Sequence, residues 1–149
     1  MDDSDKTDRQ MLEILNELRV ALPGVQILFA FLLTVPFAQG FQRVTTTQRT
    51  LFYASLLATA ASTICLIAPS ATHRLRFHKK DRAYIIESAN RYMIAGLVFL
   101  GIAIMSAIAT VTDHLYDSWI VWAAPAAVAV LLASIWFLRP LLRTESSGP

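Results

Sequence analysis

The stretch YMIAGLVFLGIAIMSAIATV, residues Tyr92–Val111, decides the fold of this chain. It holds 20 residues, and none of them is Asp, Glu, Lys, Arg or His. An α-helix rises about 1.5 Å per residue, so about 20 residues cross a hydrocarbon layer of about 30 Å. Backbone amides find no water in such a layer and must bond within the segment. The stretch therefore predicts a membrane-spanning helix.

Three further runs have the same uncharged, apolar character. They are Val25–Phe41, Thr50–Pro69 and Ser118–Leu138, with 17, 20 and 21 residues. With the first run they hold 78 of the 149 residues, which leaves little of this chain for a soluble domain. A hydrophobic content of 55% and a mean hydropathy of +0.49 exclude a water-soluble enzyme and a disordered chain. We expect an all-α fold, a four-helix bundle forming one membrane domain over residues 1–149.

The distribution of cations predicts the orientation of these spans. Lys and Arg collect on the cytoplasmic flanks of membrane helices. With the N-terminus inside, the outer loops hold only Arg43 and Arg49, and the inner segments hold Lys6, Arg9, Arg19, Arg74, Arg76, Lys79, Lys80, Arg82, Arg91, Arg139 and Arg143. Both termini are then cytoplasmic in a multi-pass protein of a bacterial inner membrane, and residues 139–149 form a flexible cytoplasmic tail. Short loops at 42–49 and 112–117 predict two antiparallel hairpins.

Before the first span, residues 8–22 predict an amphipathic helix. Apolar side chains recur there at intervals of three and four residues and form one stripe, made of Met11, Leu15, Leu18 and Leu22. Thr7 and Gln10 have the spacing of a capping box, and Pro23-Gly24 predicts a bend into the span. Two interpretations stay open: the helix docks on a partner or a second copy, or it lies against its own bundle.

The most basic stretch is His73–Arg82, between the second and third spans. Its cations could bind anionic lipid headgroups, each contributing on the order of 1 kcal/mol near a membrane surface. The alternative is that they only fix the topology. The candidate lipid-binding residues are Arg74, Arg76, Lys79, Lys80 and Arg82.

Within the spans, small and hydroxyl-bearing residues predict close helix packing. Ser55, Thr59 and Thr63 recur every four residues, with Ser62 adjoining, and such stripes let two backbones approach. Gly96 and Ala103 offer a similar small surface on the third span. These positions, together with the apolar stripe of residues 11–22, are the candidate surfaces for helix packing or for a partner.

Three polar side chains are the candidates for transport. Gln26 is the second residue of the first predicted span, and Glu87 with Asn90 lies about one turn outside the third. Glu87 and Arg91 are four residues apart, so a paired cap on the bundle is the simpler interpretation. A carboxylate that handles protons or cations is the alternative.

The residue types argue against catalysis. No ionisable group lies within a span, whereas proton relays and intramembrane hydrolases place such groups there. A single cysteine, Cys65, cannot form an intramolecular disulfide or a cysteine-based metal site. A net charge of +2 is too small to imply nucleic acid. We therefore expect no enzyme activity, no cofactor, no metal and no nucleic-acid partner.

The stretch ELRVALPGVQILFAFLLTVPF, Glu17–Phe37, resembles the opening signature of an uncharacterised bacterial four-span membrane family, known as domain of unknown function 6328. The resemblance extends in layout along most of the chain. It implies a membrane protein, and members of the family are sometimes labelled sodium:proton antiporter. Gln26 is the strongly polar side chain deep in this stretch, and an amide cannot titrate.

These observations together predict a non-catalytic integral membrane protein. It would be an accessory or assembly subunit of a membrane complex, or a self-associating scaffold. Its partners would be the lipid bilayer and either other membrane subunits or further copies of itself. The alternative is a small oligomeric transporter of ions or solutes, of the cation or proton type.

Overall fold

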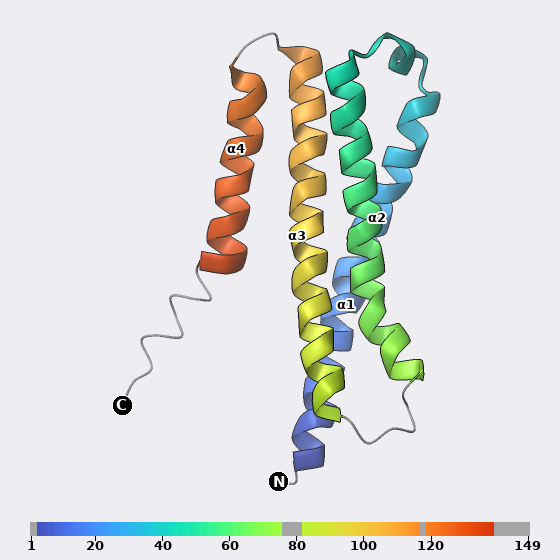
Figure 1. Ribbon diagram of the computed structural model, residues 1–149, viewed down its shortest axis with the longest axis vertical. Coiled ribbons are helices and arrows are strands. Elements are labelled where there is room, and N and C mark those ends of the chain that lie inside the picture. The colour runs from blue at the N-terminus through green and yellow to red at the C-terminus, as the bar shows by residue number, and fades with distance from the viewer. Residues whose placement is uncertain (1–2, 76–81, 117–118, 139–149) are drawn as a thin grey trace.

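The described residues form four α-helices (Figure 1). The computed structural model describes residues 3–75, 82–116 and 119–138. The helices are α1 (Asp3–Thr34), α2 (Thr46–Leu75), α3 (Arg82–Leu115) and α4 (Ile120–Ala133). Two 3₁₀ turns, η1 (Val35–Phe37) and η2 (Gln39–Arg43), join α1 to α2, and a π-helical turn, η3 (Ser134–Leu138), follows α4. The described part of the chain contains no strand, so the predicted all-α class is confirmed.

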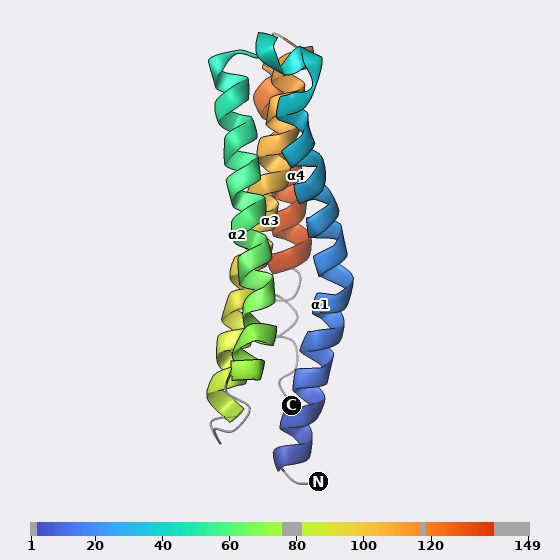
Figure 2. The ribbon, with the colours of Figure 1, turned by 90° about the vertical axis from the view of Figure 1, so that its right-hand side faces the viewer.

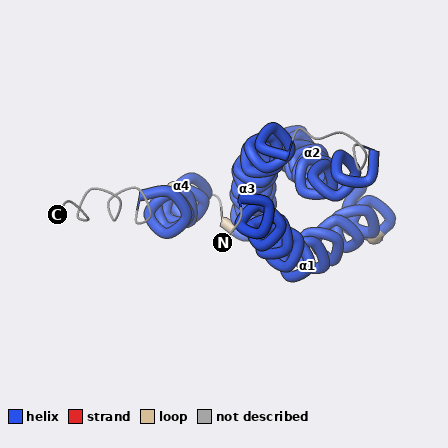
Figure 3. The backbone as a smooth tube through the Cα atoms, turned by 90° about the horizontal axis from the view of Figure 1, so that it is seen from below, coloured by secondary structure: helices blue, strands red, loops and turns tan. Residues whose placement is uncertain are grey.

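Three of the helices form the body of the molecule, and the fourth stands beside it. Helices α1, α2 and α3 contact one another, and the most extensive contact is between α2 and α3. Among the described helices, α4 packs against α3 alone, as the view along the helices shows (Figure 3). The predicted four-helix bundle is thus a three-helix group with one helix attached to its side. An exposed surface on α4 follows from this arrangement, because a single neighbour covers only one face of a helix.

Three helices are long and apolar enough to cross a membrane. The apolar segments are Leu15–Phe37, Thr46–Thr72 and Glu87–Leu115, with 23, 27 and 29 residues. The fourth apolar segment, Ile120–Trp136, is shorter than the predicted span of 21 residues. Part of that prediction falls on residues 117–118, which lie outside the described residues, as does the predicted tail at 139–149.

Helix α1 differs from the sequence prediction in its continuity through Pro23, in its start and in its end. The segment expected at residues 8–22 and residues 25–34 of the first expected span are one continuous helix that passes through Pro23 (Figure 2). Proline leaves the carbonyl four residues earlier without a donor. Here Pro23 and Gly24 are both exposed, so the helix continues with that carbonyl on its outer side. Thr7 lies inside the helix rather than at its start, so the predicted capping box at Thr7–Gln10 is wrong.

The end of α1 also comes earlier than the sequence predicted. The helix stops at Thr34 instead of continuing to Phe41, and the chain turns through η1 and η2. Pro36 explains the stop, because proline disfavours helical geometry at the residue before it and donates no backbone hydrogen bond.

The apolar core joins α1, α2 and α3. Leu18 and Val25 of α1 meet Leu66 of α2, and each of the three is at most 2% exposed. Met93 and Leu100 of α3 pack against this cluster. Removal of such side chains from water or lipid contact fixes which face of α1 points inward.

Candidate functional site

A stripe of hydroxyl side chains on α2 forms the contact with α3. Ser55, Thr59 and Ser62 are completely buried, with 0% of their surface exposed. The Ser55 hydroxyl donates a hydrogen bond to the backbone carbonyl of Ala103, with 2.8 Å between the oxygens. The Ser62 hydroxyl donates to the carbonyl of Gly96 at 2.7 Å. Two bonds seven residues apart thus tie one helix backbone to the side chains of the other.

The remaining hydroxyls of the stripe bond within their own helix. Thr59 donates to the carbonyl of Ser55 at 2.8 Å, and Thr63 donates to the carbonyl of Thr59 at 2.9 Å. The first bond satisfies a hydroxyl that is completely buried, which would otherwise cost on the order of 1–3 kcal/mol, and Thr63 is partly buried. Each of the five described buried polar side chains has a hydrogen-bond partner in its own helix or in a neighbouring one. They are Gln48, Ser55, Thr59, Ser62 and Thr112.

Gly96 marks the closest approach of α3 to α2. A Cβ atom at this position would lie 2.7 Å from Leu66 Cδ2 and 2.8 Å from Leu66 Cγ. Leu66 is 1% exposed and belongs to the apolar core, so it has little space to move. Ala103, seven residues further along α3, is also completely buried. The small residues predicted on the third span therefore face α2 within one chain rather than a free surface.

The apolar stripe of the N-terminal segment is also used within the chain. Leu18 is 2% exposed in the core, and Leu15 and Leu22 pack against it. The side chain of Met11 is not described. This geometry favours the interpretation in which the segment lies against its own bundle over the one in which it docks on a partner.

The three transport candidates do not converge. Gln26 lies exposed on α1, and Asn90 lies exposed on α3. Glu87 and Arg91 form an ion pair at 2.8 Å, with 67% and 78% of their side-chain surfaces exposed. Pairs this exposed contribute between about 0 and 1 kcal/mol, because water screens them. These residues line none of the described surface grooves.

The basic stretch is described only at its two ends. Arg74 lies exposed in the last turn of α2, and Arg82 begins α3, with a side chain that is not described. Arg76, Lys79 and Lys80 lie outside the described residues. The lipid-binding prediction for this stretch stays a prediction.

Gln48 is an important residue that the sequence analysis did not identify. Its backbone amide donates to the Thr45 hydroxyl at 3.2 Å, and its side-chain oxygen accepts from the Thr45 amide at 3.1 Å. The side-chain amide donates to the carbonyl of Asp113, which lies in the last turn of α3, at 3.2 Å. This is a capping box at the start of α2 that also ties the start of α2 to the end of α3. The Thr-x-x-Gln spacing directly before an apolar run was the available signal.

Two surface grooves flank Phe41 in the turn between α1 and α2. One has a volume of about 290 Å³ and reaches Gln48 and His114. The other has a volume of about 460 Å³ and lies against α2, with Arg49 among its lining residues. Phe41 also contacts Phe52 edge to face, with 5.1 Å between the ring centroids. Only the folded turn brings these residues together, so spacing along the sequence gave no signal of either groove.

The remaining chemistry of the described residues is sparse. No group of three or more His, Cys, Asp or Glu side chains in the described part of the chain is arranged to hold a metal ion. Cys65 is a half-buried free thiol beside the Gly96 contact.

The described residues form an all-helical protein, with three helices long and apolar enough to span a bilayer and a packed, hydrogen-bonded α2–α3 contact. The chain belongs to the Family of unknown function (DUF6328), whose model matches residues 2–140. The resemblance of Glu17–Phe37 to that family is thereby confirmed. No curated protein and no solved structure matches the chain.

Proposed function

We propose that this chain is a non-catalytic integral membrane protein that acts by associating with other membrane proteins or with copies of itself. It is an accessory or assembly subunit of a membrane complex, or a scaffold that associates with copies of itself. The observation that carries the proposal is the exposed amide of Gln26, which lies in the middle of an apolar segment of α1.

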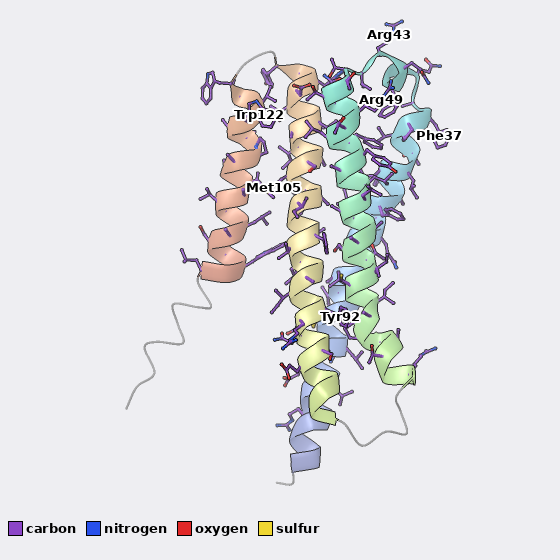
Figure 4. The ribbon with its side chains drawn as sticks, viewed as in Figure 1. Phe37, Arg43, Arg49, Tyr92, Met105 and Trp122 are labelled. Atoms are coloured by element: carbon purple, nitrogen blue, oxygen red, sulfur yellow. The ribbon has the colours of Figure 1, made fainter. Side chains whose placement is uncertain are left out.

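Charge-free lengths of helix support insertion into a bilayer. Residues 20–42, 50–73 and 92–112 contain no Asp, Glu, Lys or Arg. At about 1.5 Å per helical residue, the stretches on α2 and α3 correspond to about 36 Å and about 32 Å, enough for a hydrocarbon layer, whereas α1 ends at Thr34 and its charge-free helical part is shorter. Phe37 lies toward one end of the molecule and Tyr92 lies in the opposite half (Figure 4). The excess of Lys and Arg in the inner segments supports cytoplasmic termini and a bacterial inner membrane.

Gln26 supports a protein partner. It comes seven residues after Arg19, which places it about 10 Å along the helix from the nearest charge. Its side chain is exposed, so in a bilayer it would face lipid. An amide has no hydrogen-bond partner in hydrocarbon, and glutamine in membrane helices therefore bonds across to other helices, with a contribution of about 1–2 kcal/mol in model peptides. A neighbouring subunit is the natural source of that bond.

Helix α4 offers additional contact surface. It packs against α3 alone, and Val130 and Leu131 on its outer side are exposed. We propose that α4 with its flanking residues is a fourth span and forms a hairpin with α3. Packing and interhelical hydrogen bonds drive association in membranes, so an α4 face with one neighbour leaves room for another helix.

The test is the substitution Gln26→Leu, with Ile27→Leu as the matched control. Ile27 is an exposed neighbour without a polar group, so its substitution changes shape alone. The protein is extracted from native membranes in mild detergent, and the mass and composition of the intact particle are measured. We expect a stable oligomer or a stoichiometric complex for the wild type and the control. Gln26→Leu should weaken the association about fivefold or more, as loss of about 1 kcal/mol requires. A wild-type monomer without partners, or equal association for both variants, would contradict the proposal.

The outward position of Gln26 also favours a second candidate, a small oligomeric transporter of ions or solutes. A polar path between copies would need amides on the outer surface of each copy, where Gln26 and Asn90 lie. Flux through proteoliposomes containing the purified oligomer distinguishes the two. A flux that disappears in Gln26→Leu while the oligomer persists would support transport, whereas an oligomer without measurable flux would support the scaffold.

A further inference from the structure

The larger groove beside Phe41 has an almost entirely apolar lining, and Arg49 is among the residues that line it. It has a volume of about 460 Å³, within the range of about 300–1,000 Å³ that small-molecule sites occupy. Pro36 and Phe41 line it from the turn, and Arg49, Tyr53 and Leu56 line it from α2. The lining is almost entirely apolar apart from Arg49 and Thr50.

The groove is aligned with the direction in which a lipid molecule lies. Arg49, Tyr53 and Leu56 follow one another at intervals of four and three residues, so they lie along one face of α2. Seven residues of helix place Leu56 about 10 Å deeper along the axis than Arg49. Arg49 is the last charge before the uncharged stretch 50–73, at the level where headgroups meet hydrocarbon. Tyr53, which is 57% exposed, lies between the charge and the apolar end.

We propose that this groove binds an anionic phospholipid of the outer leaflet. The guanidinium of Arg49 binds the phosphate, and one acyl chain lies against Phe41, Tyr53 and Leu56. The planar fork of arginine matches phosphate oxygens, and a charge-assisted bond of this kind is stronger than a neutral one. An anionic headgroup complements Arg49, whereas the ammonium of a zwitterionic headgroup is repelled by it. The apolar lining below the charge requires a ligand with a hydrocarbon chain rather than a free phosphate.

This site is separate from the basic stretch between α2 and α3. Figure 4 shows Arg43 and Arg49 at the end of the molecule opposite Tyr92. Arg43 is exposed at the same end as Arg49 but does not line the groove, so it provides a matched control. The inference rests on the membrane insertion proposed above, because the depth of the groove is defined relative to a bilayer.

The experiment measures lipid binding to the full-length protein by intact-particle mass spectrometry. Protein stripped of lipid in mild detergent is titrated with phosphatidylglycerol or phosphatidylethanolamine, and bound molecules are counted. The variants are Arg49→Gln, Arg43→Gln and Leu56→Trp, which places an indole in the groove. We expect Arg49→Gln to weaken phosphatidylglycerol binding about tenfold, the loss expected for one charge-assisted bond, and Arg43→Gln to change it by less than about twofold. Leu56→Trp should weaken the binding of both lipids.

Four results would overturn the proposal. Equal loss in the two arginine variants would mean that general surface charge attracts the lipid. Unchanged binding in Leu56→Trp would mean that no acyl chain enters the groove. Competition by water-soluble glycerol phosphate at the concentration of the lipid would identify a phosphate site instead. Wild-type binding of phosphatidylethanolamine as tight as that of phosphatidylglycerol would remove the preference for an anionic headgroup.

A separate measurement distinguishes failure of this site from failure of the proposed function. Membranes are washed with alkaline carbonate, which releases peripheral proteins and leaves integral ones in place. Release of the wild-type protein would overturn both the membrane insertion and the lipid site. Retention, together with unchanged phosphatidylglycerol binding by Arg49→Gln, would overturn the lipid site alone.

Discussion

Replacement of Gly96 by alanine should destabilise the protein, although alanine is the better helix former. The added Cβ would lie 2.7 Å from Leu66 Cδ2 and 2.8 Å from Leu66 Cγ, where real contacts essentially never occur. Leu66 cannot retreat easily, because it is 1% exposed and packs with Leu18 and Val25. Cys65 Cβ, at 3.5 Å, limits the space on the other side.

The magnitude follows from two opposing contributions. Glycine to alanine in a helix stabilises by about 1 kcal/mol, because the unfolded chain loses freedom. Forcing an extra carbon into a packed contact costs about 1–3 kcal/mol. Gly101 provides the matched control on the same helix, since its added Cβ would meet Leu132 Cδ1 at an ordinary 3.7 Å. We expect Gly101→Ala to stabilise the protein and Gly96→Ala to be less stable than Gly101→Ala by about 1–3 kcal/mol, which is the clash alone.

The assay is titration of the purified protein from mild to denaturing detergent, with helix content followed by circular dichroism. Leu66→Ala removes the atoms that meet the new Cβ, so Gly96→Ala should become neutral or stabilising in that background. Such a change of sign is the signature of direct contact between two positions. Equal stability of Gly96→Ala and Gly101→Ala in the wild-type background would refute the close approach of α2 and α3 at Gly96.

Two further predictions concern hydrogen bonds that the structure shows. Ser62→Ala loses the bond to the Gly96 carbonyl, which joins two helices, and should lower the stability by about 1 kcal/mol in the same titration. The control Thr63→Ala loses only a bond within α2. An equal loss of stability in both variants would contradict this assignment. Gln48→Ala loses its side-chain bond of the capping box and the link to the Asp113 carbonyl, and it should cost about 2 kcal/mol. Thr45→Ala loses only the other bond of the capping box and should cost about 1 kcal/mol. Hydrogen exchange of the amides at the start of α2 measures the loss of the cap, and equal stability of the two variants would mean that the Asp113 link contributes nothing.

Local patterns in the sequence predicted the helices, but not the residues at which the helices end. The uncharged apolar runs predicted long helices because backbone hydrogen bonds within a helix need no distant partner. The end of α1 was predicted at Phe41 from composition, whereas Pro36 stops it at Thr34. The segment before the first span and that span were predicted as separate segments, whereas α1 runs through Pro23 as one helix.

The site shows the same division. The spacing of Ser55 and Thr59 predicted a surface for close helix packing, since residues four apart share a face of a helix. Whether that surface meets a helix of the same chain or of another one depends on partners that are distant in sequence. Local reasoning equally missed Gln48, although the capping-box spacing was present, because its link to Asp113 bridges 65 residues.

By itself, the sequence determined that this protein is helical, that it contains long uncharged apolar stretches, and which faces carry small and hydroxyl-bearing residues. These properties depend on charge, hydropathy and spacing within about one helix length. Only the tertiary structure decided that the hydroxyl stripe of α2 bonds to backbone carbonyls of α3, that the stripe around Leu18 is buried in its own bundle, and that α4 touches α3 alone. Those outcomes depend on how side chains from separate helices fit together, and the fit is a property of shapes in contact that no single segment contains.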